Sequence, residues 1–288
     1  MKRDIYFDFA DEVYKKKNKV VKKRTTSKDN IEVTWISLLE DDNEFHKKKG
    51  NYITLQLDEI SSIDEESFIK AFKKELNKLI RLNNVANNGK VLVVGLGNDQ
   101  YNSDSLGPKV IDSIFITSHI KDRVDDIVRS VSSFKPGVMS KTGLESSNMV
   151  KALQDKEKFS LIIVIDSLAT TSPSRLFKVI QMTDTGISPG SGVLNHRLPL
   201  DKETMGVPVI CVGVATVLES AYLIYDYILK QELDISLNEI RESLEQEEFN
   251  YIITSNDIDQ LIKTISYLIS EGINYSLNPT YEELLRHN

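Results

Sequence analysis

The sequence predicts an α/β protein, a three-layer sandwich with a largely parallel sheet. From residue 90 onward, short continuous apolar runs alternate with amphipathic stretches of helical length. A strand that is covered on both faces has such a continuous run, and strands that alternate with helices are typical of a parallel sheet. We expect strands at residues 91–94, 127–131, 161–165, 176–182 and 209–214, and helices at residues 108–120, 145–154 and 216–230.

The two ends of the chain add further elements. Residues 31–36 and 52–57 alternate well enough to predict half-buried strands. Ser62 and Glu65 have the spacing of a capping box, and one face of the helix after them carries Phe68, Phe72, Leu76 and Leu79. A last amphipathic helix is expected at residues 257–273, with inward-facing Ile258, Leu261, Ile262, Ile265 and Ile269. We therefore predict one α/β domain with N-terminal strands and a helix, and with a C-terminal helix.

Composition excludes several classes of protein. The chain has 288 residues, of which 40% are hydrophobic, and a net charge of −7, so wholesale binding to nucleic acid is not expected. No apolar run approaches the ~20 residues of a membrane span, and the N-terminus lacks the apolar core of a secretory signal. The single cysteine, Cys211, stands in an apolar run and indicates an inert buried thiol. Basic clusters within residues 15–49 indicate a solvated surface, or else a contact for an acidic substrate. These observations predict a soluble cytoplasmic protein.

Two carboxylates follow predicted buried strands. Asp104 lies in the loop after residues 91–94, and Asp166 directly follows residues 161–165. Ligands of open α/β sheets bind at the carboxyl ends of the strands, so both aspartates are expected at the same edge of the sheet. An aspartate at a strand end also commonly caps a helix. Position alone therefore leaves both catalysis and capping open.

Other motifs in the chain have weaker support. Gly95 and Gly97 follow a strand, but Gln100 occupies the third glycine position of a dinucleotide fingerprint. Ser188 lies in a literal G-x-S-x-G pattern, but turn-forming residues surround it where a nucleophile elbow needs a strand and a helix. Asp104, Asp166 and His196 form a possible mixed ligand set for a metal. Metal chemistry therefore stays open, whereas nucleotide binding and serine catalysis are disfavoured.

Several longer blocks together resemble the germination protease family of endospore-forming bacteria. The likeness extends over nearly the whole chain and includes residues 50–55 (GNYITL), 95–110 (GLGNDQYNSDSLGPKV), 136–146 (PGVMSKTGLES), 165–169 (IDSLA), 184–193 (DTGISPGSGV) and 202–210 (KETMGVPVI). Two positions depart from the family pattern. Ala215 stands where the family usually has proline, and His196 stands where it has lysine.

The resemblance implies an endopeptidase that degrades small acid-soluble spore proteins early in germination. It implies a fold similar to that of hydrogenase-maturation proteases, a homotetramer, and a location in the forespore and spore core. The family's proposed catalytic aspartates fall on Asp104 and Asp166. We expect no cofactor, no direct contact with nucleic acid and no membrane association.

The family is made as a zymogen that removes its own N-terminus. The segment that begins at Phe7 (FDFADE) resembles the site at which the family cuts its substrates. We therefore expect cleavage between Asp8 and Phe9, with residues 1–8 as a propeptide and residues 9–288 as a single α/β protease domain.

The implied chemistry is hydrolysis by two carboxyl groups that share a proton. Like charges held close together cannot both ionise easily, so one carboxyl stays protonated and can act as the acid. Backbone amides near Gly95, Gly97 and Asn98, or near Gly190 and Gly192, are candidates for stabilising the oxyanion. Two alternatives stay open: a metal-dependent peptidase at the same carboxylates, and a catalytically silent homologue that acts as a binding scaffold.

Overall fold

The structure is a computed structural model that describes residues 21–41, 47–120, 128–188, 198–231, 235–249 and 251–281. Six residues named above lie outside these ranges: Phe7, Asp8, Phe9, Gly190, Gly192 and His196. Among the described residues, no helix combines the length and the apolar character that crossing a membrane requires.

The strands of the described residues form one mixed sheet with the order β1-β2-β3-β7-β8-β6-β4-β5. Four neighbouring strands are parallel: β5 (Val131–Phe134), β4 (Val91–Gly95), β6 (Leu161–Thr170) and β8 (Val209–Glu219). The remaining strands pair antiparallel: β7 (Val179–Thr183), β3 (Gly50–Leu57), β2 (Ile31–Leu38), β1 (Val21–Lys28) and the short β9 (Ile252–Ile253), which pairs with β8. The α/β class is confirmed.

The prediction of a largely parallel sheet is correct for β5, β4, β6 and β8, but it is wrong for the sheet taken as a whole. Only residues 171–178, with a 3-10 helix η4 (Pro173–Arg175), connect β6 to β7. A parallel crossover needs a dozen or more residues, usually with a helix, so this connection returns the chain antiparallel. The parallel half of the sheet is the half that carries Asp104 and Asp166.

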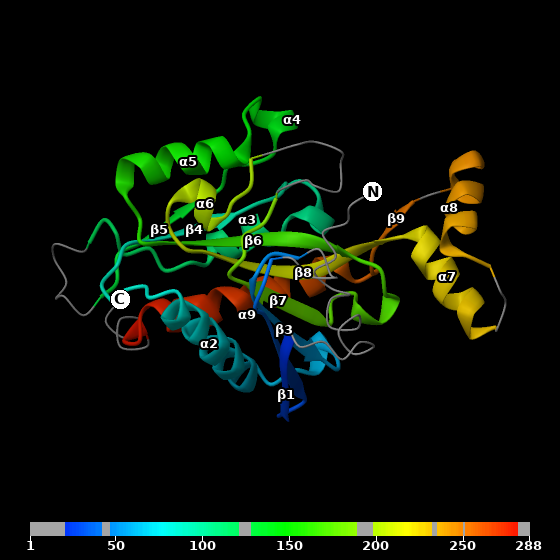
Figure 1. The fold of residues 1–288 in the computed structure, drawn as a ribbon, viewed down its shortest axis with the longest axis horizontal. Helices are drawn as coiled ribbons and strands as arrows, with labels where there is room; N and C mark the ends of the chain where they lie inside the picture. Colours follow the sequence, from blue (N-terminus) through cyan, green and yellow to red (C-terminus); the bar gives the residue numbers. More distant parts are fainter. Residues whose placement is uncertain are drawn as a thin grey trace.

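Helices cover both faces of the sheet (Figure 1). One core cluster packs α2 (Glu65–Leu82), α3 (Leu106–Asp112) and α9 (Ile258–Leu277) against odd-numbered residues of β6 such as Ile163. The other packs α5 (Ser146–Glu157) and α6 (Lys202–Met205) against even-numbered residues such as Val164. The predicted inward stripe of α2 is confirmed, because Phe68, Phe72, Leu76 and Leu79 are fully buried.

Some predicted boundaries differ from the structure. The cap of α2 is Asp64, whose carboxylate accepts the Ser67 N–H at 2.9 Å, so the predicted capping box at Ser62 is wrong. Residues 216–219, predicted as helix, continue strand β8, where β6 pairs with Val217 and Leu218 and β9 pairs with Leu218 and Glu219. Helix α3 ends at Asp112 and β5 begins at Val131, so both differ from the predicted ranges.

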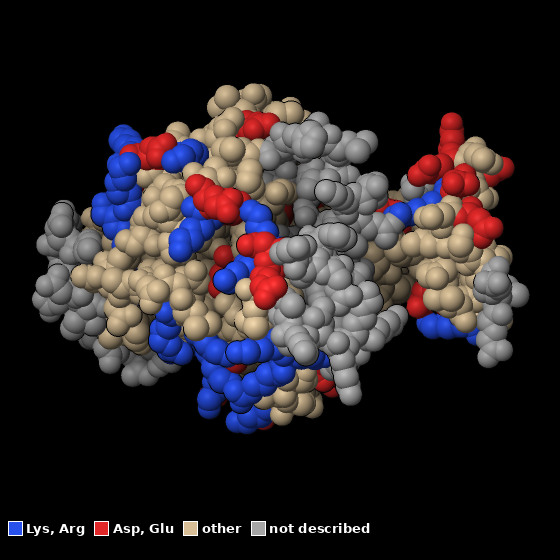
Figure 2. Space-filling view, in the orientation of Figure 1, with Lys and Arg blue, Asp and Glu red and all other residues tan. Residues whose placement is uncertain are grey.

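Two surface regions extend from this core. The edge strand β1 exposes Lys22 and Arg24, and Figure 2 shows basic side chains gathered in this part of the molecule. Charged side chains on an edge strand disfavour pairing with other chains. At the other side, α7 (Ser220–Lys230) and α8 (Leu237–Gln246) follow β8 and project from the body as an arm (Figure 1). The described elements also include the short helices η1 (Ile60–Ser62) and α4 (Met139–Thr142).

Candidate active site

Asp104 is held in the loop after β4 by backbone contacts. The 3-10 helix η2 (Asn102–Asp104) ends at this residue, and the Asn98 N–H donates to the Asp104 carbonyl at 2.8 Å. Gly97 has a φ of +112°, and a Cβ on it would lie 2.1 Å from that same carbonyl oxygen. The loop can therefore close on Asp104 only if residue 97 is glycine.

The glycines in this region serve close packing. A Cβ on Gly95 would lie 2.3 Å from the Gly107 carbonyl oxygen, and one on Gly107 would lie 2.2 Å from that of Leu96. Strand β4 and helix α3 thus approach each other where neither has a side chain. Because the Asn98 N–H is bonded to Asp104, the oxyanion role predicted for the Asn98 amide loses support.

Asp166 lies on strand β6, on the face that α5 and α6 cover. Side chains alternate along a strand, and Ile162 and Val164 of β6 belong to the core cluster on that face. The Ser167 N–H donates to Asp166 Oδ1 at 2.9 Å. Both Asp166 and Asp104 are half-buried.

The two carboxyl groups interact electrostatically. Burial and, to a smaller extent, the charge of Asp104 raise the pKa of Asp166 to about 8, although the Ser167 N–H acts in the opposite direction. Burial likewise raises the pKa of Asp104 to about 6, against the backbone N–H of Asn98. The structure therefore brings together the two aspartates that the sequence placed at one edge of the sheet. Near neutral pH, Asp166 is mostly protonated and Asp104 mostly ionised.

A threonine on a neighbouring strand anchors the Asp104 loop. Thr216 Oγ1 donates to the Ser103 carbonyl at 2.7 Å, and Thr216 is completely buried. The pairing of β6 with β8 steps from Leu168↔Ala215 to Ala169↔Val217, which makes Thr216 the extra residue of a β-bulge. Bulges commonly re-aim a side chain beside an active site. Thr216 is not among the residues predicted from the sequence, because a bulge leaves no clear mark in an apolar strand.

The remaining candidate residues are placed as follows. Cys211 is buried as predicted, and burial, together with the charge of Asp166, raises the pKa of its thiol. Ser188 follows an isolated bridge between Ile187 and Leu200, not the strand that a nucleophile elbow needs. Among the described residues, no group of three His, Cys, Asp or Glu side chains could hold a metal ion.

Comparison with known proteins decides the family. A family model described as germination protease matches residues 3–239. The chain belongs to the germination protease family. The germination protease of Clostridium acetobutylicum is 37% identical and aligns with 88% of this chain and 87% of its own length. That of Caldanaerobacter subterraneus is 35% identical over 95% of this chain and 93% of its own length.

A solved structure is more distantly similar to this member of the germination protease family. It is the [NiFe] hydrogenase maturation protease HycI from Thermococcus kodakarensis, with a TM-score of 0.35 and 17% sequence identity. The alignment covers 67% of this chain and 98% of that chain. A TM-score of this size carries no argument about the site.

The bulge lies next to a position that departs from the expected germination protease pattern. Ala215 stands where the predicted family pattern has proline, and it lies beside the point where the β6–β8 ladder is interrupted. Proline is tolerated in strands at such interruptions. Alanine therefore fits the same backbone, and the departure leaves Asp104 and Asp166 in place.

Proposed function

We propose that the chain is an endopeptidase that begins the degradation of small acid-soluble, DNA-binding spore proteins during germination. The supporting observation is the pair of half-buried carboxyl groups, in which the charge of Asp104 raises the pKa of Asp166. When the pKa values of two carboxyl groups differ, one group can be protonated and act as an acid while the other is ionised and acts as a base at the same pH. Membership of the germination protease family supports the substrate class. The forespore and spore core, where these substrates lie, is the proposed location.

The two pKa shifts suggest which aspartate takes which role. Asp104, with a pKa of about 6, draws a proton from water, whose oxygen attacks the scissile carbonyl. Asp166, with a pKa of about 8, donates its proton to the carbonyl oxygen. Collapse of the tetrahedral intermediate returns that proton to Asp166, while Asp104 gives its proton to the leaving amine. Proton transfers of this kind contribute about 10²–10⁴-fold to a rate.

Direct cleavage of a purified substrate tests this proposal. We expect the purified chain to cut a small acid-soluble spore protein at a single sequence, with fragments identified by mass spectrometry. Intact substrate after prolonged incubation, together with an N-terminus that stays uncleaved, would favour the scaffold alternative. Activity lost on exhaustive chelation and restored by one added divalent metal would favour the metal-dependent alternative.

We also propose that the chain is made as a zymogen that cuts itself between Asp8 and Phe9. The motif around these residues supports this proposal, and both lie outside the described residues. Residues 9–288 then form the single α/β protease domain. N-terminal sequencing after incubation at mildly acidic pH should give Phe9 as the first residue. An intact Met1 in fully active enzyme would exclude the propeptide.

The arm supports a proposed assembly of four copies. Its helix α7 exposes Leu223, Ile224, Tyr227 and Leu229, with Tyr227 65% exposed. Leu223, Ile224 and Tyr227 share one side of this helix by their spacing, and exposed apolar side chains gathered in this way mark protein interfaces. We expect Tyr227→Glu to lower the mass measured by light scattering from that of a tetramer. Tyr101→Glu is the matched control, because Tyr101 is also 65% exposed but lies outside the arm. An unchanged mass in Tyr227→Glu would contradict the proposal that this surface of α7 forms a contact between copies.

A further inference from the structure

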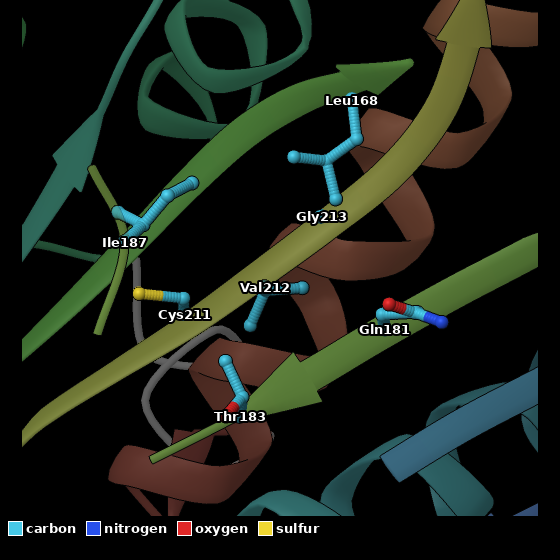
Figure 3. A pocket seen from close by; sticks show the side chains of 7 residues that line it. All are labelled: Leu168, Gln181, Thr183, Ile187, Cys211, Val212 and Gly213. Carbon is cyan, nitrogen blue, oxygen red and sulfur yellow. The ribbon is translucent and has the colours of Figure 1, made fainter. Parts of the chain in front are cut away.

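The pocket beside Asp166 has no room for a substrate side chain. It lies between β6, β8 and β7, and its free volume of about 10 Å³ is room for about one water molecule. The Leu168 side chain reaches from β6 over Gly213, the partner of Asp166 in the β6–β8 ladder (Figure 3). A Cβ on Gly213 would lie 2.1 Å from Leu168 Cδ1. This pocket therefore cannot select a residue of the substrate.

The strand register leads from Asp166 across the sheet to its edge. The row of paired residues that starts at Asp166 continues through Gly213, Gln181, Thr54, Thr34 and Thr25. Neighbouring strands lie about 4.8 Å apart, so the edge strand β1 lies about 24 Å from Asp166, at the same level of the sheet. A long polypeptide substrate spans this distance, whereas a short peptide does not.

Four basic side chains of β1 and α2 converge beside this edge. Arg24 of β1 pairs with Trp35 of β2. Lys78 of α2 reaches over the same tryptophan, with its Nζ 3.5 Å from the ring centroid. Lys74 and Arg81 lie four residues before and three residues after Lys78, so they share its side of the helix. We call Arg24, Lys74, Lys78 and Arg81 the basic patch, and Figure 2 shows basic side chains gathered in this part of the molecule.

The positive charge of the basic patch is not balanced. Burial lowers the pKa of Lys78, the charge of Glu75 opposes this effect, and the charges of the three other patch residues act with burial. Glu75 is itself buried, and its carboxylate accepts Trp35 Nε1–H and pairs with Lys74 at 3.2 Å. Its single charge is already shared in this way, so the patch keeps a net positive charge.

The two arginines of the patch are available to a partner. Arg24 and Arg81 are exposed, and neither takes part in the ion pairs that the described residues form. Protein surfaces ordinarily mix both signs of charge, and like charges held together destabilise the free protein by self-repulsion. The structure therefore favours a contact for an acidic partner over the solvated surface that the sequence also left open.

We propose that the basic patch binds an acidic segment of the polypeptide substrate, away from the scissile bond. The proposal rests on the proposed peptidase function and adds a second site of contact with the substrate. The segment FDFADE, which resembles the cleavage site of the substrates, carries three carboxylates in six residues, so acidic side chains fit the proposed substrate class. A nucleic acid fits less well, because the net charge of −7 repels a long polyanion beyond the patch.

The dimensions of the patch match a short acidic stretch. Lys74 and Arg81 are seven residues apart in α2, which is about 10 Å at a rise of about 1.5 Å per residue. An extended chain rises about 3.3 Å per residue, so the patch accommodates about three or four residues of the partner. By the same rise, that acidic stretch lies at least about seven residues from the bond at Asp166.

Binding of fluorescein-labelled poly-glutamate, measured by anisotropy at low salt, tests the patch directly. Arg24→Glu and Arg81→Glu should each weaken binding at least about fivefold. Lys156→Glu is the matched control and should bind like the wild-type protein, because Lys156 and Arg81 are both exposed cations in the last turn of a helix. Equal affinities of Arg81→Glu and Lys156→Glu would overturn the proposal. Duplex DNA that binds more tightly than poly-glutamate, and loses this binding in Arg81→Glu, would also overturn it in favour of a nucleic-acid contact.

Cleavage shows whether the acidic segment belongs to the substrate. The measured quantity is kcat/KM for a full-length small acid-soluble spore protein divided by kcat/KM for a peptide of residues 4–13, which is too short to reach the patch. This ratio should fall at least about fivefold in Arg81→Glu and stay at the wild-type value in Lys156→Glu. An unchanged ratio in Arg81→Glu, or an equal fall in Lys156→Glu, would contradict a substrate contact at the patch.

Binding of the intact substrate separates this proposal from the peptidase function. The full-length spore protein should bind Asp104→Asn at least about fivefold more tightly than Asp104→Asn that also carries Arg81→Glu. This difference without any cleavage by the wild-type protein would retain the patch and reject the peptidase. Cleavage by the wild-type protein without this difference would reject the patch and retain the peptidase. Neither the difference nor cleavage would overturn both.

Discussion

Thr216 Oγ1 donates a 2.7 Å hydrogen bond to the Ser103 carbonyl, and this bond joins strand β8 to the loop that ends at Asp104. The backbone of the same threonine accepts a hydrogen bond from Thr254 Oγ1 at 2.7 Å. The position of the Asp104 carboxyl thus depends on β8, which lies on the far side of β6, the strand that carries Asp166. Thr216 acts on the reaction through Asp104 and is a positioning residue.

Thr216→Val should lower kcat about tenfold with little change in KM. The isosteric change removes the donor to the Ser103 carbonyl, which frees the Asp104 loop at a cost of about 0.5–1.5 kcal/mol. It should also move the acid limb of the pH–rate profile, because the surroundings of Asp104 change. Thr216→Ser keeps the donor and should restore both readouts. Equal kinetics for Thr216→Val and wild-type enzyme would contradict a positioning role.

Asp104→Asn and Asp166→Asn should each reduce kcat/KM for peptide cleavage by at least about 10³-fold, because each removes one partner of the proton exchange. Asp99→Asn is the matched control. Asp99 lies on the same loop, is exposed, and pairs with Lys141 at 2.9 Å. Circular dichroism and thermal melting should show that all three variants are folded. Near-wild-type turnover by folded Asp104→Asn or by folded Asp166→Asn would contradict the proposal that these two aspartates form a catalytic pair.

The pH–rate profile of kcat/KM should be bell-shaped, with limbs near 6 and 8. The charge of Asp104 is present above its pKa of about 6 and is lost as pH falls through it. The proton of Asp166 is present below its pKa of about 8 and is lost as pH rises through it. The two limbs belong to the coupled pair. A profile that stays flat from pH 5 to pH 9 would contradict the assignment.

The same shifts predict how stability depends on pH. Both folded pKa values lie above the ordinary 3.8, so between pH 4 and pH 8 the native state binds more protons than the unfolded state. These two groups therefore lower the free energy of unfolding as pH rises. Asp166→Asn should raise Tm at pH 9, by about 2–4 °C for each kcal/mol regained, and by less at pH 5. An equal change in Tm at both pH values would contradict the raised pKa.

Gly97→Ala should destabilise the fold and reduce activity, because the new Cβ meets the Asp104 carbonyl. Gly143→Ala is the control for backbone strain alone, since Gly143 has a φ of +71° and nothing within 4 Å of its Cβ position. That control should cost about 1–2 kcal/mol of stability and leave kcat unchanged. Denaturant unfolding and peptide cleavage measure the two effects. If the two variants behave alike, Gly97 has no special role at Asp104.

Local patterns were sufficient for much of this molecule. The stripe of Phe68, Phe72, Leu76 and Leu79 predicts the buried face of α2, because a helix repeats every 3.6 residues. The continuous apolar runs of β4, β6 and β8 predict strands that are covered on both faces. The same rules place Asp104 and Asp166 at the carboxyl edge of the sheet. Each of these inferences depends only on neighbours in the sequence.

Pairing between strands far apart in the sequence decided the features that local patterns do not predict. The antiparallel return of β7, the bulge at Thr216 and the row from Asp166 through Gly213 to Gln181 all depend on register between strands far apart in the sequence. The raised pKa of Asp166 likewise depends on its burial and on the charge of a residue from another element. Register and burial result from packing of the whole chain. The residue types and their order therefore predicted which groups are available for chemistry, and only the folded sheet decided their surroundings.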